Sequence, residues 1–189
     1  QYGLFGWIFG TYSYQGGKIV SQYYNNYTSV NYCIPESLKK VTITDEKYIG
    51  YGAFYEINWL EEINLNEGIS LIGNLAFFNN TALKEMTVPS SVTSMGEKAF
   101  YQCSGIESIT LPFTGSSLND TNNTRLSYIF DSTNNRIYDN LKSVTITNET
   151  SVKDDAFKDC SGLETISYSQ NITSIGDSAY YGCSGLSVI

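Results

Sequence analysis

The sequence predicts a repeat solenoid with one parallel β-strand per coil, short turns or 3-10 segments between strands, and little helix. Two observations predict this fold class. Segments of 22 to 23 residues recur through most of the 189-residue chain. Each segment also begins with an alternation of apolar and polar residues, which is typical of a strand with one buried face. Because one repeat cannot bury that face alone, stacked neighbours are expected to bury it together.

Each repeat opens on an apolar residue, and the segment that begins at Leu83 aligns along its whole length with the one that begins at Leu163. The openers are Leu38, Leu60, Leu83, Ile106, Leu141, Leu163 and Leu186. They are separated by 22, 23, 23, 35, 22 and 23 residues, so one repeat is about twelve residues longer than the others. Further apolar residues three and five positions after each opener predict the strand.

Two more columns follow in each repeat. The first pairs an apolar residue with glycine, at Ile49-Gly50, Ile72-Gly73, Met95-Gly96 and Ile175-Gly176. We expect this glycine to adopt a φ that a side chain would oppose, so Lys153, which follows Val152, marks a different turn. The second column pairs alanine with an aromatic residue, at Ala53-Phe54, Ala76-Phe77, Ala99-Phe100, Ala156-Phe157 and Ala179-Tyr180. Alanine lets adjacent coils approach, and the aromatic ring fills the space between layers.

Three of the four cysteines, Cys103, Cys160 and Cys183, share one column, which Ile57 and Asn80 fill in other repeats. Equivalent side chains in a parallel stack point the same way, which is poor geometry for a disulfide, so we expect buried free thiols. Cys33 lies outside the column and is the candidate for an exposed thiol. Without the paired spacing of a zinc or redox site, the cysteines predict no metal and no cofactor.

The residue after each opener alternates in charge, which predicts a ladder of ion pairs across the strands, worth roughly 0.2 to 1 kcal/mol per pair. Its members are Lys39, Glu61, Lys84, Glu107, Lys142 and Glu164. The acidic pairs Glu61-Glu62 and Asp154-Asp155 resemble the two carboxylates of a glycoside hydrolase. The ladder position of the first pair favours a role in register instead, and we expect the second to lie in a solvated bend.

Two groups of residues are candidates for ligand binding. The first is a column between the inward strand positions, expected on the exposed concave side of the sheet. Its members are Thr42, Asn64, Thr87, Thr110, Thr145 and Ser167. It either accepts a polypeptide or sugar or is plain solvated sheet. The second group comes from residues 11–32, where tyrosine is mixed with Ser, Gly and Asn as in binding loops. Its candidate contacts are Tyr12, Tyr14, Tyr23, Tyr24 and Tyr27. The alternative, that these side chains and Tyr32 pack a hairpin against the first coil, stays open.

The chain is expected to form a single array over residues 1–189. Residues 1–37 form a partial long unit in which residues 5–9 match residues 126–130, followed by a hairpin that pairs residues 11–15 with 18–24 around Gly16-Gly17. Ordinary repeats occupy residues 38–111 and 141–189. Residues 112–140 hold an insertion, with a solvated loop at 115–124 and a segment at 126–130 that adds a strand or packs beside the coil. Because the last repeat ends inside a strand with no polar cap, we expect a cut piece of a longer protein.

Composition excludes several classes of function. The chain has no His, which removes Ser-His-Asp and Cys-His catalysis and His-ligated metals. A net charge of -8 predicts repulsion from a phosphate backbone, so nucleic acid is not an expected partner. No apolar run approaches the roughly 20 residues of a membrane span. Low charge content with 16 tyrosines and abundant Ser, Thr and Asn is typical of an extracellular protein.

The segment SVTSMGEKAFYQCSGIESITLP, residues 91–112, resembles the BspA-like leucine-rich repeat family, in its Treponema-type subclass with 23-residue units. The resemblance extends over residues 38–189. It implies a curved right-handed solenoid, displayed at the surface of bacteria or certain anaerobic protists and associated with adhesion.

We therefore hypothesise a monomeric, non-enzymatic binding module, located at the cell surface or secreted, that mediates adhesion or protein-protein interaction. Its partner would be a host or microbial surface or extracellular-matrix protein or glycan. The alternatives are a structural stalk that holds another domain away from the cell, and a carbohydrate-active enzyme, which the absence of a convergent acid and base disfavours.

Overall fold

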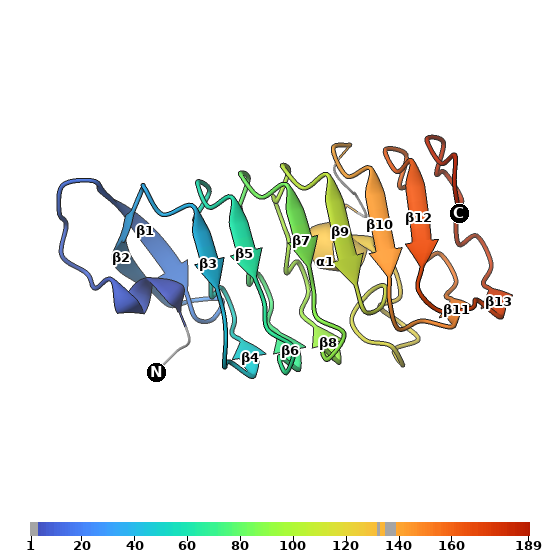
Figure 1. The fold of residues 1–189 in the computed structure, drawn as a ribbon, viewed down its shortest axis with the longest axis horizontal. Helices are drawn as coiled ribbons and strands as arrows, with labels where there is room; N and C mark the ends of the chain where they lie inside the picture. The colour runs from blue at the N-terminus through green and yellow to red at the C-terminus, as the bar shows by residue number, and fades with distance from the viewer. Residues whose placement is uncertain (1–3, 132, 135–138) are drawn as a thin grey trace.

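The computed structural model describes residues 4–131, 133–134 and 139–189, which form one elongated stack of coils with the two termini at opposite ends (Figure 1). Six parallel strands follow one another along the side that faces the viewer in Figure 1. They are β3 (Lys40–Thr42), β5 (Glu62–Asn64), β7 (Glu85–Thr87), β9 (Ser108–Leu111), β10 (Ser143–Ile146) and β12 (Thr165–Tyr168). The predicted solenoid with little helix is confirmed.

The register of these strands is the one that the repeat columns predict. Val144 of β10 lies between Ile109 of β9 and Ile166 of β12. Hydrogen bonds join β3 to β5 and join β7, β9, β10 and β12 into a second group, but they do not join β5 to β7. The repeat spacing places Glu62 beside Glu85 at that boundary, and like charges on neighbouring strands disfavour pairing.

A second row of two-residue strands runs along the stack, and the sequence did not predict it. Its members are β4 (Tyr48–Ile49), β6 (Leu71–Ile72), β8 (Ser94–Met95), β11 (Ser151–Val152) and β13 (Ser174–Ile175). These strands coincide with the column in which an apolar residue precedes glycine. Strands β4, β6 and β8 pair in one parallel ladder, and β11 pairs with β13 in another. Neighbouring coils are therefore joined by strand pairing along two separate rows.

Close packing explains three of these glycines, Gly73, Gly96 and Gly176, and the expectation of an unusual φ was wrong. None of the four has a positive φ. A Cβ atom on Gly73 would instead lie 2.7 Å from the backbone nitrogen of Tyr51 in the preceding coil. Lys153 replaces the glycine where a cavity of about 370 Å³ beside Thr121 and Thr124 leaves room for a side chain.

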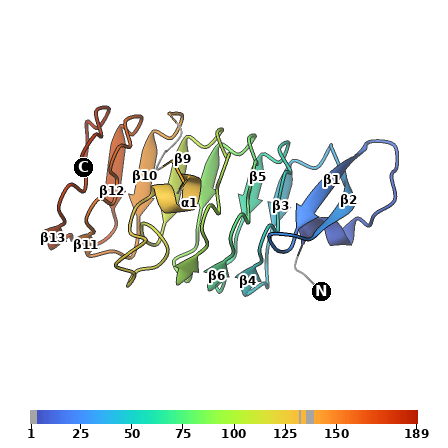
Figure 2. The ribbon, with the colours of Figure 1, turned by 180° about the vertical axis from the view of Figure 1, so that it is seen from behind.

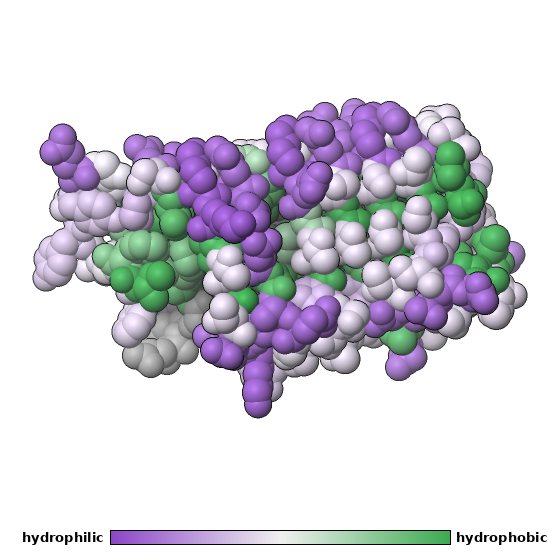
Figure 3. Space-filling view, viewed as in Figure 1, coloured by the Kyte–Doolittle hydropathy of each residue, from purple (hydrophilic) through white to green (hydrophobic). Residues whose placement is uncertain are grey.

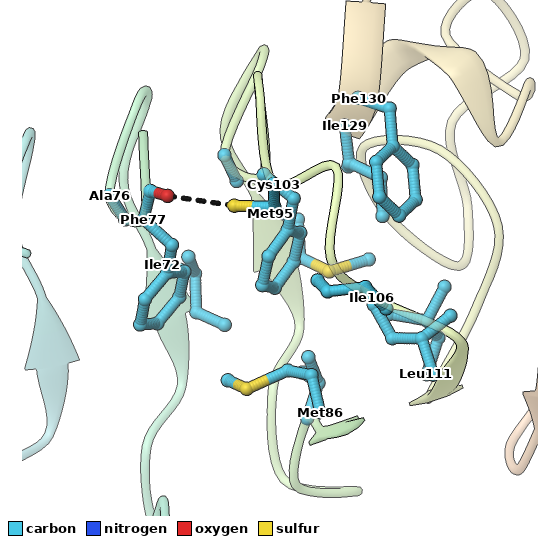
Figure 4. Close-up of a cluster of buried hydrophobic side chains, with 14 of the residues drawn as sticks. Ile72, Ala76, Phe77, Met86, Met95, Cys103, Ile106, Leu111, Ile129 and Phe130 are labelled. Carbon is cyan, nitrogen blue, oxygen red and sulfur yellow. Dashed lines mark hydrogen bonds between the residues drawn. The ribbon is translucent and has the colours of Figure 1, made fainter. Parts of the chain in front are cut away.

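The core is a column of aromatic rings that runs through the stack. Phe77 lies between Phe54, with ring centroids 5.5 Å apart, and Phe100, with centroids 5.0 Å apart, and both pairs are stacked. Phe130 continues the column from Phe100 at 5.9 Å. Figure 4 shows Phe77 and Phe130 with the methionine and aliphatic side chains that fill the space around them. The expectation that aromatic residues fill the layers is confirmed.

The cysteine column holds free thiols, as expected. Cys103 and Cys160 are buried and Cys183 is half-buried. The Cys103 thiol donates to the carbonyl oxygen of Phe77 at 2.8 Å, which Figure 4 marks, and the Cys183 thiol donates to the corresponding oxygen of Phe157 at 3.0 Å. In three coils the column therefore supplies a hydrogen-bond donor to the carbonyl oxygen of the aromatic residue in the preceding coil, from Asn80, Cys103 and Cys183. Burial raises the pKa of the Cys103 thiol to about 12, so this thiol stays protonated.

The N-terminal unit contains a hairpin, but the predicted pairing of its strands was wrong. Strand β1 (Gly17–Tyr23) pairs antiparallel with β2 (Ser29–Pro35), and residues 11–16 form a loop. The turn is built by Asn25, whose side-chain oxygen accepts from the backbone nitrogens of Tyr27 and Thr28, both at 2.8 Å. An Asx turn of this kind can reverse the direction of the chain, as a glycine pair can.

Cys33 lies on β2 and is fully buried, so the prediction of an exposed thiol was wrong. The reason is that β2 packs on the core of the array through Tyr32 and Ile34 as well. The hairpin and the 3-10 helix η1 (Phe5–Ile8) thus cover one end of the first coil. The Phe5 ring extends the aromatic column from Phe54 at 4.9 Å.

The insertion packs beside the stack through a single helical turn. Residues 127–131 form α1 (Ser127–Asp131), so the expectation of packing is met and that of an added strand is not. In Figure 2, α1 lies on the side of the stack opposite to the strands. Asp155, expected in a solvated bend, is half-buried and pairs with Arg125 at 2.5 Å and Lys158 at 3.2 Å. Asp154 is exposed as expected.

Candidate functional site

The outward side of the six long strands carries the candidate column and is called the polar face below. The structure brings the column together as one line of side chains, one per strand. Thr42, Asn64 and Thr87 are exposed, whereas Thr110 and Thr145 are half-buried. Inward neighbours such as Ile109 are buried, because successive side chains of a strand point to opposite sides. Figure 3 shows this face, with strongly hydrophilic residues along its upper edge and pale residues across its middle.

The charged row beside the column consists of the ion pairs that the alternation predicts. Nitrogen-oxygen distances are 3.2 Å for Lys39–Glu61, 2.9 Å for Lys84–Glu107 and 3.5 Å for Lys142–Glu164. All six side chains are about half exposed, so water screens these pairs and each adds little stability. These ion pairs therefore determine the pattern of charge on the polar face but contribute little to the stability of the fold.

A cavity of about 360 Å³ opens the polar face between β5 and β7, where the strands are not hydrogen-bonded to each other. Glu62, Asn64, Glu85 and Thr87 contribute polar groups to its walls. The Glu62 carboxylate accepts from Asn64 at 2.8 Å and pairs with Lys40 at 2.7 Å. Hydrogen bonds from these two residues hold the pKa of Glu62 below its usual value. The cavity therefore presents an ionised carboxylate beside hydroxyl and amide groups.

The tyrosine group divides into exposed and packed side chains. Tyr12 and Tyr27 lie in loops and are 89% and 93% exposed. Tyr14 is partly exposed, and its hydroxyl donates to the carbonyl oxygen of Cys33 at 3.0 Å. Tyr23 packs against the ring of Tyr55 with centroids 4.9 Å apart.

The two remaining tyrosines of the segment belong to the packed class. Tyr24 is half-buried against the core, and Tyr32 is a core residue. Tyr23, Tyr24 and Tyr32 thus attach the hairpin to the array, whereas the Tyr14 hydroxyl bonds within the N-terminal unit.

Two buried polar residues with clear structural roles were missed by sequence reasoning. Gln22 is fully buried, accepts from the backbone nitrogen of Gly6 at 2.7 Å and donates to the carbonyl oxygen of Ala53 at 3.3 Å. Glu149 is also buried and accepts from the nitrogen and hydroxyl of Thr114 at 3.1 and 3.0 Å. Burial raises the pKa of Glu149. Gln22 has no counterpart in the repeats, and glutamate at the position of Glu149 recurs only at Glu46, so no column signals either residue.

Three of the carboxylates considered for catalysis form ion pairs with basic side chains. Glu61 and Glu62 each face a lysine of the preceding coil, and Asp155 faces two cations. Among residues 4–131, 133–134 and 139–189, no three His, Cys, Asp or Glu side chains gather as a metal site would require. No helix in the described part of the chain combines the length and apolar character needed to cross a bilayer.

The family model for the BspA type leucine-rich repeat region matches residues 26–140 and 127–189, with six copies. The chain therefore belongs to the BspA-type leucine-rich repeat family. This membership indicates a module of the protein-protein interaction or adhesion type. A comparison with curated proteins finds no match.

A solved structure of a bacterial leucine-rich repeat protein shares the fold. The T. pallidum leucine-rich repeat protein matches with a TM-score of 0.55 at 22% identity, over 80% of this chain and 66% of that protein. A leucine-rich repeat protein from Eubacterium ventriosum matches with a TM-score of 0.49 at 23% identity, over 78% of this chain and 44% of that protein. The BspA-type chain thus spans less than two thirds of the length of either protein.

Proposed function

We propose that this chain is a non-enzymatic binding module, at the cell surface or secreted, that adheres to a surface or extracellular-matrix protein or glycan of a host or another microbe. The observation that carries the proposal is the polar face. It offers one hydrogen-bonding side chain per strand from Thr42 to Ser167, and six strands spaced by about 4.8 Å span roughly 24 Å. Family membership supports the same class of function.

The chemistry of the face suits an extended or flat partner. Hydroxyl groups donate and accept, so they can bind either backbone amides or sugar hydroxyls. A stable protein interface needs about 800 Å² per partner, so a partner would have to cover the sheet together with its charged row and the neighbouring turns. The cavity between β5 and β7 interrupts the face with two carboxylates, Glu62 and Glu85, which favour a donor or cation from the partner.

Tyr12 and Tyr27 are proposed as additional contacts. Their rings are almost fully exposed and offer large amphipathic area at low cost in conformational entropy. The packed residues Tyr14, Tyr23 and Tyr24 would act mainly by holding the loops that carry them.

Capture from a defined panel tests the proposal. The immobilised chain is exposed to purified extracellular-matrix proteins, matrix glycans and surface extracts of partner bacteria, and bound material is quantified. The double variant Thr87→Arg/Thr110→Arg adds bulk and charge to the face and should lose capture. The control Asn119→Arg/Asn171→Arg adds the same charge at exposed loop positions and should retain it.

Two results would contradict the proposal. Failure to capture anything across the panel would favour the stalk interpretation, in which the array only spaces other domains. Turnover of a polysaccharide that disappears on changing one carboxylate would favour an enzyme.

A further inference from the structure

Two of the free thiols lie next to each other in neighbouring coils. Cys160 follows β11, and Cys183 takes the same place one coil later, after β13. The backbone nitrogen of Asp159 donates to the carbonyl oxygen of Tyr181 at 2.7 Å, which holds the two coils together directly beside the cysteines. Chain segments paired in this way lie about 4.8 Å apart. The Cα atoms of disulfide-bonded cysteines are usually roughly 4.4 to 6.8 Å apart, so the spacing of the coils suits a disulfide.

The side chains of these two cysteines do not point the same way, which removes the argument against a disulfide in a parallel stack. The Cys183 thiol donates to the carbonyl oxygen of Phe157 at 3.0 Å and therefore points back toward the coil that contains Cys160. The Cys160 thiol forms a hydrogen bond with the sulfur of Cys183. Its own sulfur lies 3.8 Å from the carbonyl oxygen of Lys158 in the same coil. The two sulfur atoms thus meet between the coils.

Cys183 has the properties of the thiol that reacts first. It is half-buried, whereas the other three cysteines are buried, so a small oxidant reaches it more easily. The hydrogen bond from the Cys160 thiol lowers the pKa of Cys183, which raises the fraction of Cys183 that is thiolate at neutral pH. The Cys160 thiol is already in contact with Cys183 and is placed to react second.

We propose that Cys160 and Cys183 form a site of oxidative modification, at which a small-molecule disulfide converts the two thiols into a disulfide that joins neighbouring coils. The Cys183 thiolate attacks one sulfur of the small disulfide, breaks its S–S bond and releases one small thiolate. The Cys160 sulfur then attacks the Cys183 sulfur of this mixed disulfide and releases the second small thiolate. The protein thiols are oxidised, and the small disulfide is reduced to two thiols that carry away the two protons.

The link would connect two coils that are otherwise held by hydrogen bonds and packing. It would close a loop from residue 160 to residue 183, which restricts the unfolded chain and thereby stabilises the folded one. Disulfides persist in oxidising surroundings such as those outside the cell. The site does not involve the polar face and goes beyond the function proposed above.

Incubation of the folded protein with oxidised glutathione, followed by alkylation of the remaining thiols and mass spectrometry, tests the proposal. Digestion after glutamate cuts the chain at Glu164, between the two cysteines, so the link is detected as two joined peptides. The expected product has lost two hydrogen atoms, carries the Cys160–Cys183 link and keeps free thiols at Cys33 and Cys103. Its melting temperature should lie roughly 5 to 10 °C above that of the reduced protein.

Two variants are compared with and without oxidised glutathione. Cys183→Ser keeps a donor at this position but cannot form the link, so its melting temperature should not change on oxidation. Cys103→Ser replaces a buried cysteine of the same column and should form the link as the unchanged protein does. Persistence of all four thiols, a stable glutathione adduct at Cys183, or a link between any other pair would overturn the proposal. So would a Cys160–Cys183 link that forms only in urea, because the thiols would then meet only in the unfolded chain.

Discussion

Replacement of Phe100 by alanine should be among the most destabilising single changes in the chain. The ring is fully buried, stacks on Phe77 at 5.0 Å with an interplanar angle of 8°, and contacts Phe130 at 5.9 Å. A buried Phe→Ala change costs about 3 to 5 kcal/mol through lost transfer free energy and the cavity left behind. Two ring contacts are lost here, each worth roughly 0.5 to 1.5 kcal/mol, so the upper half of that range is expected.

Urea unfolding followed by circular dichroism measures this loss. Tyr180→Ala is the matched control in the same column, because Tyr180 is half-buried and stacks on Phe157 alone among the described rings, at 5.8 Å. It should lose roughly half as much free energy of unfolding. Thr87→Ala on the polar face should change that free energy by less than about 0.5 kcal/mol. Equal losses from Phe100→Ala and Thr87→Ala would refute the assignment of inward and outward positions.

Three further predictions address thiols, pH and backbone packing. Native iodoacetamide labelling followed by mass spectrometry should modify Cys183 first. A hydrogen bond from the Cys160 thiol lowers the pKa of Cys183, whereas burial raises the pKa of Cys103 to about 12. Faster labelling of Cys103 would contradict its burial. Because the pKa of Glu149 is raised, the folded chain holds this proton more tightly than the unfolded chain does. The stability that the protonated Glu149 contributes to the fold is therefore complete below the unfolded pKa of about 4.3 and is lost as pH rises through the folded pKa. Glu149→Gln should therefore raise the melting temperature at pH 7 by more than at pH 4, and an equal effect at both would be inconsistent with burial. Gly73→Ala should lower the free energy of unfolding by about 1 to 3 kcal/mol, because its Cβ would lie 2.7 Å from a backbone nitrogen, and urea unfolding that matches the unchanged protein would argue against the close approach of the coils.

The sequence predicts those parts of the structure that repeat. A contact such as the stacking of Phe77 on Phe100 is made again in each coil, so the residues that make it recur at a fixed spacing. The ion pair Lys84–Glu107 is recognisable for the same reason. Of the candidate site, the alignment of the Thr87 column on one face could therefore be predicted.

The parts that do not repeat escaped prediction. Pairing of β1 with β2 depends on a single turn at Asn25, and burial of Cys33 follows from that pairing. Gln22 is a polar residue whose role depends on one contact with η1. The glycines at Gly73 and its equivalents were found by their column, but a column does not show whether φ or a close neighbour requires the glycine.

Photo-cross-linking of a captured partner tests the central claim most directly, because it reports where the partner lies on the array. A photoreactive amino acid is placed in turn at Thr87, Thr110 and Thr145 on the polar face, and at Asn119 and Asn171 in exposed loops. The proposed function predicts that the partner is linked from the three face positions and from neither loop position. Linkage from the loop positions, with none from the face, would contradict it.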